Sequence, residues 1–218
     1  MKQIIYLIGI DGSGKTTLSY NLIKELKLNN IDSKYFYARH FPILLYPIKI
    51  FGKKSILKNT DEFKDYTNYK NKKVTFFKKH RVLAYLYGLL WFFDYFVVTW
   101  VRFIGILLSK KIIIVDRFFL DVIINISVTI NLRIEQVIKY SKIASYFFPK
   151  PDYYIFIDIP PKIAFERKND IQSIIYLKER RKLYLKLQNL FNFKFVDGTE
   201  TKEQLVKSVL KIINYIPN

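Results

Sequence analysis

Short apolar runs alternate with longer stretches of helical periodicity along most of the chain. Residues 3–8, 33–38, 111–115, 153–157 and 193–196 are rich in β-branched and aromatic side chains, and we predict that they form strands. Helices are expected over 15–28, 74–109, 119–148, 161–168, 171–191 and 201–216, whereas 41–65 predicts a loop with short helices. Such alternation is typical of a parallel sheet covered by helices on both faces. We therefore predict a single three-layer α/β domain over residues 1–218, with a five-stranded parallel sheet.

The most apolar stretch of the chain is residues 82–108, where Asp94 and Arg102 are the only formal charges. Its length is close to what a helix needs to span a bilayer. Asp94 lies in the middle of the stretch, and a charge at that depth in a membrane is costly. We therefore expect a long helix buried in the domain. Attachment to a membrane interface and contact with a second copy of the chain are the alternatives.

The charge balance is strongly basic, with 37 Lys and Arg against 18 Asp and Glu. A net charge of +19 favours an anionic partner such as a nucleotide. The lysines are scattered and accompany no nucleic-acid-binding motif, so we expect no specific nucleic acid partner. The chain has no cysteine, which excludes disulfides and thiolate metal sites. Its first residues do not match a signal peptide, and we expect a cytoplasmic protein.

One motif lies between the first predicted strand and the first predicted helix. Residues 9–16, Gly-Ile-Asp-Gly-Ser-Gly-Lys-Thr, match the phosphate-binding pattern G-x-x-x-x-G-K-[ST]. Glycines let backbone N–H groups approach phosphate oxygens, and the helix N-terminus adds partial positive charge. Lys15 can bridge the β- and γ-phosphates, and the Thr16 hydroxyl can ligate Mg²⁺. The motif predicts a P-loop NTPase fold that binds a triphosphate through Gly9, Ile10, Asp11, Gly12, Ser13, Gly14, Lys15, Thr16 and Thr17.

Four charged residues follow predicted strands, at the edge where open α/β sheets bind ligands. Asp11, inside the loop, can accept a hydrogen bond from an acceptor hydroxyl or help to hold the metal; the alternative is a simple turn aspartate. Arg39, after the second strand, can bind an acceptor phosphate or be a surface arginine. Asp116 and Arg117 end the third strand, where the carboxylate can hold Mg²⁺ and the arginine can bridge two anions; a strand-end ion pair is the alternative.

A basic segment over residues 167–182 is predicted to form a lid. Phosphoryl transfer needs neutralisation of charge and exclusion of water at the transferred group, and a mobile basic helix supplies both. Arg180 and Arg181 are the candidate arginines within it, because the phosphate loop has none. The alternative for each is a solvated helical face. His40 and His80 are lone histidines to which we assign no chemistry.

Together these residues resemble the thymidylate kinase family of nucleoside monophosphate kinases. The likeness is carried, in the family's order, by the loop at 9–17, Arg39 with Pro42, the Val-Asp-Arg-Phe run at 115–118, the Pro-Asp to Glu-Arg run at 151–167, and Val-Asp-Gly-Thr at 196–199. On the donor side, the resemblance implies that Lys15 and Thr16 hold ATP and Mg²⁺ and that Arg167 lies against the donor adenine. On the acceptor side, it implies that Asp11 faces the sugar and that Arg39 and Arg117 bind the phosphate. It also implies that the lid arginines stabilise transfer.

The chain departs from the family pattern on the acceptor side. After Arg39 the usual acidic residue and glycine are missing, and the helix expected to bind the base keeps Trp91 and Asp94 but has Tyr95 where arginine is usual. We therefore predict ATP-dependent phosphoryl transfer to a nucleoside monophosphate, with dTMP as the leading acceptor and dTDP as the product. The alternatives are a different acceptor (a nucleoside, a sugar or a lipid-linked group) and a non-catalytic nucleotide-binding protein.

Overall fold

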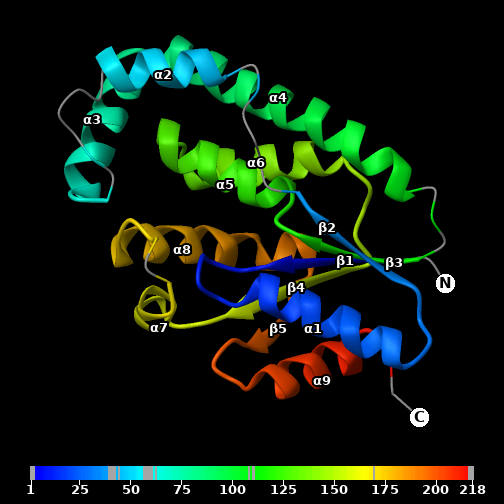
Figure 1. Ribbon diagram of the computed structural model, residues 1–218. Coiled ribbons are helices and arrows are strands. Elements are labelled where there is room, and N and C mark those ends of the chain that lie inside the picture. The colour runs from blue at the N-terminus through cyan, green and yellow to red at the C-terminus, as the bar shows by residue number, and fades with distance from the viewer. Residues whose placement is uncertain are drawn as a thin grey trace.

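The computed structural model describes residues 3–38, 43, 45–55, 61, 63–107, 109, 111–168 and 170–215. Its centre is a sheet of five parallel strands in the order β2-β3-β1-β4-β5, which confirms the predicted fold class (Figure 1). The strands lie close to the predicted positions, and their bounds are β1 (Gln3–Ile8), β2 (Ser33–Tyr37), β3 (Ile112–Asp116), β4 (Tyr153–Asp158) and β5 (Lys194–Asp197).

Helices cover both faces of this sheet (Figure 1). On one face lie α1 (Lys15–Leu28) and α9 (Lys202–Ile212), whose buried leucines and valines pack against one side of the strands. The other face is covered by α4 (Arg81–Leu107), α5 (Phe119–Ile130), α6 (Ile134–Ser145) and α8 (Ile174–Phe191). Three further helices, α2 (Tyr46–Ser55), α3 (Tyr66–Lys79) and α7 (Pro161–Glu166), complete the described helices.

The strand sequences explain why the sheet is covered twice. In β1, Ile5 and Leu7 face the cluster formed with α1 and α9, while Ile4, Tyr6 and Ile8 face the opposite cluster. A strand buried on both faces carries a continuous apolar run, as β1, β3 and β4 do. The closing helix begins with the predicted capping box, in which the Thr201 hydroxyl accepts from the Gln204 N–H and Gln204 accepts from the Thr201 N–H.

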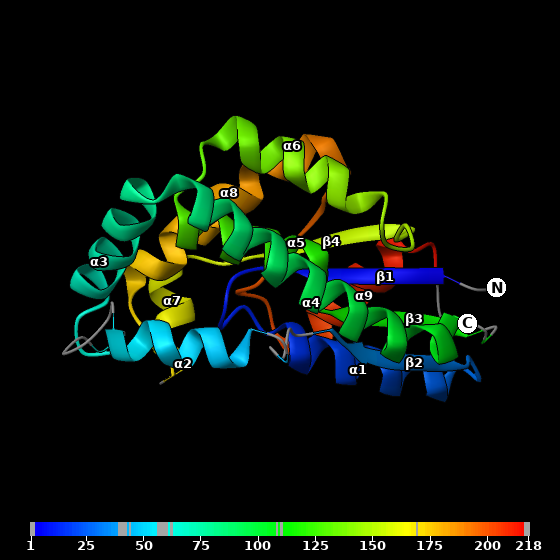
Figure 2. The same cartoon turned by 90° about the horizontal axis from the view of Figure 1, so that it is seen from above.

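One expectation about burial is wrong. The long helix predicted within residues 74–109 is present as α4, but its outer face is not covered by the rest of the described chain. Val82, Leu89 and Val101 are 74%, 63% and 73% exposed. Figure 2 shows α4 running along the outside of the molecule. Residues Arg81–Ile106 are long and apolar enough to cross a membrane, with 28% of the most apolar window buried, but core helices can meet the same length and composition criteria.

All five strands are parallel, so their carboxyl ends meet at one edge of the sheet. The phosphate loop follows β1, Arg117 follows β3, and α7 follows β4. The phosphate loop, Asp116 and Arg117 are thereby brought to the same edge, which is where ligands bind in open α/β sheets.

Candidate active site

The phosphate loop has a backbone that only glycine accommodates without strain. Gly9, Gly12 and Gly14 all have positive φ angles, of 155°, 83° and 90°. A Cβ atom on Gly12 would lie 2.2 Å from the carbonyl oxygen of Ala164 in α7. The loop is therefore packed closely against α7, and a side chain at position 12 would disturb its backbone.

The loop closes around the Lys15 side chain. Its ammonium group donates to the carbonyl oxygens of Gly9 and Ile10, at 2.7 and 2.8 Å, and it is 5% exposed. Burial and the positive charge of Arg117 lower the pKa of Lys15, while the charges of Asp11, Asp121 and Asp116 oppose that change. An ammonium held at the base of the loop by two carbonyls is positioned to turn toward phosphate oxygens bound above it.

Thr16 and Asp116 form the part of the site that fits Mg²⁺. The Thr16 hydroxyl donates to Asp116 Oδ2 at 2.6 Å, and the Tyr35 hydroxyl donates to the same oxygen at 3.0 Å. The second oxygen, Asp116 Oδ1, is buried and accepts no hydrogen bond within the described part of the chain. Because the Thr16 proton is directed at Asp116, lone pairs of Thr16 Oγ1 remain available to an ion. The unpartnered oxygen of Asp116 can accept from water bound to that ion.

Few protein ligands would be needed at such a position. No group of three or more His, Cys, Asp or Glu side chains with the geometry of a metal site occurs among the described residues. Mg²⁺ in phosphoryl-transfer sites is commonly held by one or two protein oxygens, with phosphate oxygens and water completing its shell. The pair of Thr16 and Asp116 is consistent with that pattern.

Asp11, Arg117 and Tyr176, which we call the Asp11 cluster, form the second polar group at this edge. Arg117 donates to Asp11 Oδ1 and forms an ion pair with it, and the Tyr176 hydroxyl donates to Asp11 Oδ2 at 2.9 Å. Burial raises the pKa of Asp11, but the charges of Arg117 and Lys15 and the two hydrogen bonds outweigh it and hold the pKa well below its usual range. Asp11 is therefore a carboxylate at neutral pH, which can accept but not donate a hydrogen bond.

A cavity of about 780 Å³ extends from the phosphate loop to the segment between β5 and α9. Arg167 lies in its wall, where its guanidinium donates to the Gly198 carbonyl at 2.8 Å. We call this space the donor cavity; it is lined by Gly12, Ser13, Gly14, Lys15, Thr16, Thr17, Leu18, Asn21, Arg117, Arg167, Lys168, Glu200, Thr201, Lys202, Glu203 and Leu205. Residues 200–203 are not among the predicted site residues, although they directly follow the Val-Asp-Gly-Thr run at 196–199.

The two lid arginines both bond to neighbouring protein groups. Arg180 donates through Nε and one Nη to the side-chain oxygen of Asn125, at 3.2 and 3.0 Å, and its guanidinium lies 3.4 Å from the centre of the Tyr176 ring. Arg181 forms a two-pronged pair with Asp158, at 2.7 and 2.8 Å. Neither arginine lines the donor cavity. Their roles in transfer stay predictions.

Two further predicted acceptor residues, Trp91 and Asp94, lie on α4 and contact residues outside the Asp11 cluster. Asp94 is 1% exposed, and its carboxylate accepts the backbone N–H groups of Ile43 and Leu45, at 2.9 and 3.4 Å. Trp91 is half-buried and packs edge-on against Tyr87, with ring centres 5.7 Å apart. Arg39 lies outside the described residues.

Tyr35 and Tyr176 were missed by sequence reasoning. Each bonds a carboxylate that the sequence did identify, Asp116 in one case and Asp11 in the other. The chain has 17 tyrosines, so the sequence alone does not indicate which of them lies in the site. The available signal was the spacing of Tyr176, Arg180 and Tyr184, which recur every four residues and so share one face of α8.

A glycine-rich loop between the first strand of a parallel sheet and the following helix, with a carboxylate ending a neighbouring strand beside it, defines a P-loop nucleotide-binding protein. No protein-family profile matches the chain. It is 30% identical to a protein of Saccharolobus solfataricus named probable thymidylate kinase 1, over 98% of this chain and 97% of that protein. It is 25% identical to a Metallosphaera sedula protein named probable thymidylate kinase, over 97% and 92%. The chain belongs to the thymidylate kinase family.

Proposed function

We propose that the protein transfers the γ-phosphoryl group of ATP to a nucleoside monophosphate, with dTMP as the first candidate acceptor. The observation that carries the proposal is the position of Arg117. This residue lines the donor cavity and also pairs with Asp11, so it adjoins both halves of the site. A cation between donor and acceptor phosphates is what transfer between two anions requires.

Different residues of the site bind the triphosphate, the metal ion and the acceptor. The loop N–H groups and Lys15 bind the triphosphate, and Thr16 with Asp116 would hold Mg²⁺. When bound, Mg²⁺ neutralises charge on the β- and γ-phosphates. Arg117 binds the acceptor phosphate and brings its oxygen into line with the γ-phosphorus. Asp11, which accepts but does not donate, takes a hydrogen bond from a sugar hydroxyl of the acceptor.

The two relatives named as probable thymidylate kinases support dTMP over other acceptors. Asp11 supports a sugar-bearing acceptor, since its carboxylate belongs to the phosphate loop and already accepts a hydrogen bond from the Tyr176 hydroxyl. A nucleoside, a free sugar, a lipid-linked group, or no acceptor at all are outcomes that the experiment below distinguishes.

The purified protein should be incubated with Mg-ATP and each of a panel of nucleoside monophosphates, nucleosides and sugar phosphates, with products separated by chromatography. We expect ADP and dTDP to appear together, and Lys15→Ala to abolish both. Lys24→Ala, a change to an exposed lysine on the same helix, is the matched control and should behave as wild type. ATP binding without any product in the whole panel would favour a non-catalytic protein.

We also propose that the exposed face of α4 is covered by a second copy of this chain. Large apolar side chains on this face are 38–74% exposed: Val82, Leu83, Tyr85, Leu86, Leu89, Leu90, Phe93, Val97, Val101 and Ile104. A standard interface takes about 800 Å² from each partner, and ten half-exposed side chains are of that order. Arg81 and Arg102 of α4 donate to carbonyls of Ile130 and Tyr37, so they are engaged within the chain and do not favour anionic lipid.

Sedimentation at several protein concentrations tests this proposal. The wild type should form dimers, and Leu89→Lys combined with Val97→Lys should be monomeric with an unchanged circular dichroism spectrum. Leu28→Lys, at an exposed leucine of α1, is the matched control. A monomeric wild type, or binding of the wild type to phosphatidylserine vesicles that the double variant loses, would count against the dimer.

A further inference from the structure

Arg117 has an unusual backbone for an arginine. Its φ angle is 61°, in the left-handed region that residues with a Cβ atom rarely adopt. Such a conformation is strained for a residue with a Cβ atom and persists only where neighbouring structure holds it. What holds this turn therefore also determines where the Arg117 guanidinium lies.

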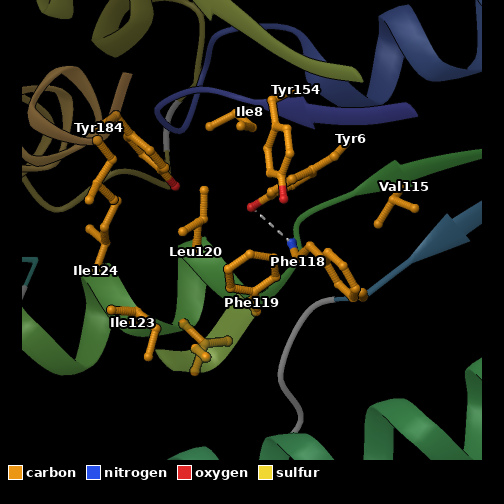
Figure 3. Close-up of a cluster of buried hydrophobic side chains, with 14 of the residues drawn as sticks. Tyr6, Ile8, Val115, Phe118, Phe119, Leu120, Ile123, Ile124, Tyr154 and Tyr184 are labelled. Atoms are coloured by element: carbon orange, nitrogen blue, oxygen red, sulfur yellow. Dashed lines mark hydrogen bonds between the residues drawn. The ribbon is translucent and has the colours of Figure 1, made fainter. Parts of the chain in front are cut away.

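The next residue along the chain is fixed by a buried carboxylate. The Phe118 N–H donates to Asp121 Oδ2 at 2.9 Å and lies 3.3 Å from the Tyr6 hydroxyl oxygen. Figure 3 shows Tyr6 reaching from β1 to this backbone nitrogen, with Tyr184 entering the same group from α8. We call Tyr6, Asp121, Tyr184 and the Phe118 N–H the Asp121 cluster.

Every donor in the Asp121 cluster is directed at the one carboxylate. The Tyr6 hydroxyl donates to Asp121 Oδ2, and the Tyr184 hydroxyl donates to Asp121 Oδ1 at 2.7 Å. Burial, followed by the negative charge of Asp121, raises the pKa of both hydroxyls, so both remain protonated donors. Tyr6, Asp121 and Tyr184 are 0%, 6% and 3% exposed, so water does not compete for these bonds.

The Asp121 cluster and the Asp11 cluster are joined by a single face of α8. Tyr184 contacts Asp121, and one turn earlier Arg180 contacts Asn125, which is itself one turn beyond Asp121 on α5. A further turn back, Tyr176 contacts Asp11. The contacts therefore connect the two ends of the same residue. Asp121 bonds the backbone next to Arg117, α8 links Asp121 to Asp11, and Asp11 bonds the Arg117 guanidinium.

We propose that Asp121, held by Tyr184, is a positioning residue that sets the Arg117 side chain against Asp11. Asp121 touches no site expected for substrate; it acts on the turn that carries Arg117. The Asp121 carboxylate accepts three hydrogen bonds at the start of α5, and its negative charge also favours a cation at position 117. The part of this inference that concerns acceptor binding rests on the proposed function.

Two substitutions probe the positioning role with little change in volume. Asp121→Asn removes the charge and replaces one acceptor oxygen by a donor, and Tyr184→Phe removes one hydroxyl. Tyr154→Phe is the matched control, because Tyr154 lies in the same buried group but bonds no atom of the Asp121 cluster (Figure 3). We expect Asp121→Asn to lower kcat/KM for the acceptor by roughly tenfold, as loss of a hydrogen bond to a charged group does, with the Kd for ATP changed less than twofold.

A double-mutant cycle separates positioning from general damage. In an Arg117→Lys background, Asp121→Asn should lower kcat/KM by less than twofold, because the group that it positions is already altered. An equal loss in both backgrounds, or an equal loss in the Tyr154→Phe control, would overturn the inference.

A measurement without substrate keeps this inference separate from the proposed function. In protein labelled with ¹⁵N-arginine, the Arg117 side-chain Nε–H resonance, assigned through Arg117→Lys, should be sharp in wild type and in Tyr154→Phe. In Asp121→Asn it should shift and exchange faster with water. An unchanged Arg117 resonance would reject the positioning role even if the enzyme phosphorylates dTMP. A changed resonance in a protein that phosphorylates nothing would reject only the proposed function.

Discussion

The Lys15 contacts of the donor side and the Asp11 contacts of the proposed acceptor side differ in how far apart the bonded residues lie in the chain. On the donor side, the Lys15 ammonium reaches the carbonyl oxygens of Gly9 and Ile10, six and five positions earlier. On the proposed acceptor side, Asp11 is bonded by Arg117 and Tyr176, which are 106 and 165 positions away. The position of Lys15 therefore depends on local backbone geometry, whereas the Asp11 contacts, like the bond from Thr16 to Asp116, 100 positions away, depend on how distant elements pack.

The two sides also differ in what must change when a ligand binds. The loop N–H groups and the donor cavity are open to a triphosphate. Each oxygen of Asp11 already accepts one hydrogen bond, so an acceptor hydroxyl either takes a remaining lone pair of the carboxylate or replaces the Tyr176 hydroxyl. Substitutions on the donor side should therefore remove binding outright, and substitutions on the acceptor side should shift binding by degrees.

The largest effect is expected from Gly12→Ala. The φ angle of 83° disfavours any side chain, and the added Cβ atom would lie 2.2 Å from the Ala164 carbonyl oxygen. Neither the loop backbone nor α7 can relieve this contact by rotating a side chain. We expect ATP binding, measured by calorimetry, to weaken by at least about 100-fold, a few kcal/mol of strain. Gly52→Ala, in open space within α2, is the control and should bind ATP normally.

Next in size is the effect of Asp116→Asn on metal dependence. The substitution removes the charge that faces the expected ion, while the Thr16 and Tyr35 hydroxyls keep an oxygen to bond. Loss of a group next to a metal ligand commonly costs about 10- to 100-fold in metal affinity or activity. The concentration of Mg²⁺ that gives half-maximal ATP turnover should rise accordingly. Tyr35→Phe removes only one of the two hydroxyls that donate to Asp116, and it should raise this Mg²⁺ concentration less. Equal effects of the two variants would argue against Asp116 as the metal-facing group.

The same contrast explains what could be predicted from the sequence. The loop at 9–16, helix α1 and the five parallel strands follow from a contiguous motif and an alternating pattern, because glycine geometry and periodicity are local properties. The partners of Asp11 and Asp121 are tyrosines on α8 that become neighbours only through packing. The exposed face of α4 was missed for a related reason: an apolar composition does not indicate which face of a helix the rest of the chain covers.

A smaller effect is expected for the pH dependence of stability in Asp11→Asn. The pKa of Asp11 is depressed in the folded protein, so its contribution is present above the unfolded-state pKa, about 4, and is lost as the pH falls below it. At neutral pH the variant should be less stable than wild type by of the order of 2 kcal/mol, because Arg117 loses its partner. Denaturant unfolding at pH 7 and pH 3 checks this. The gap between the two proteins should narrow at pH 3, and a constant gap would show that the Asp11 charge is not responsible.

The smallest effect is expected from Tyr176→Phe, which removes only the hydroxyl that donates to Asp11 Oδ2. The ring remains to pack against Tyr66 and the Arg180 guanidinium, so α8 should keep its place. Since an acceptor hydroxyl would compete with this phenol for Asp11, its removal has two opposing consequences: one bond that positions Asp11 is lost, and one competitor disappears. We expect the KM for the acceptor to change by no more than about threefold, within the range of a single neutral hydrogen bond, with the KM for ATP unchanged. Tyr146→Phe, at a tyrosine that is 76% exposed, is the control. A larger change in the KM for ATP than for the acceptor would mean that Asp11 belongs to the donor side, and the division drawn between the two sides would then be wrong.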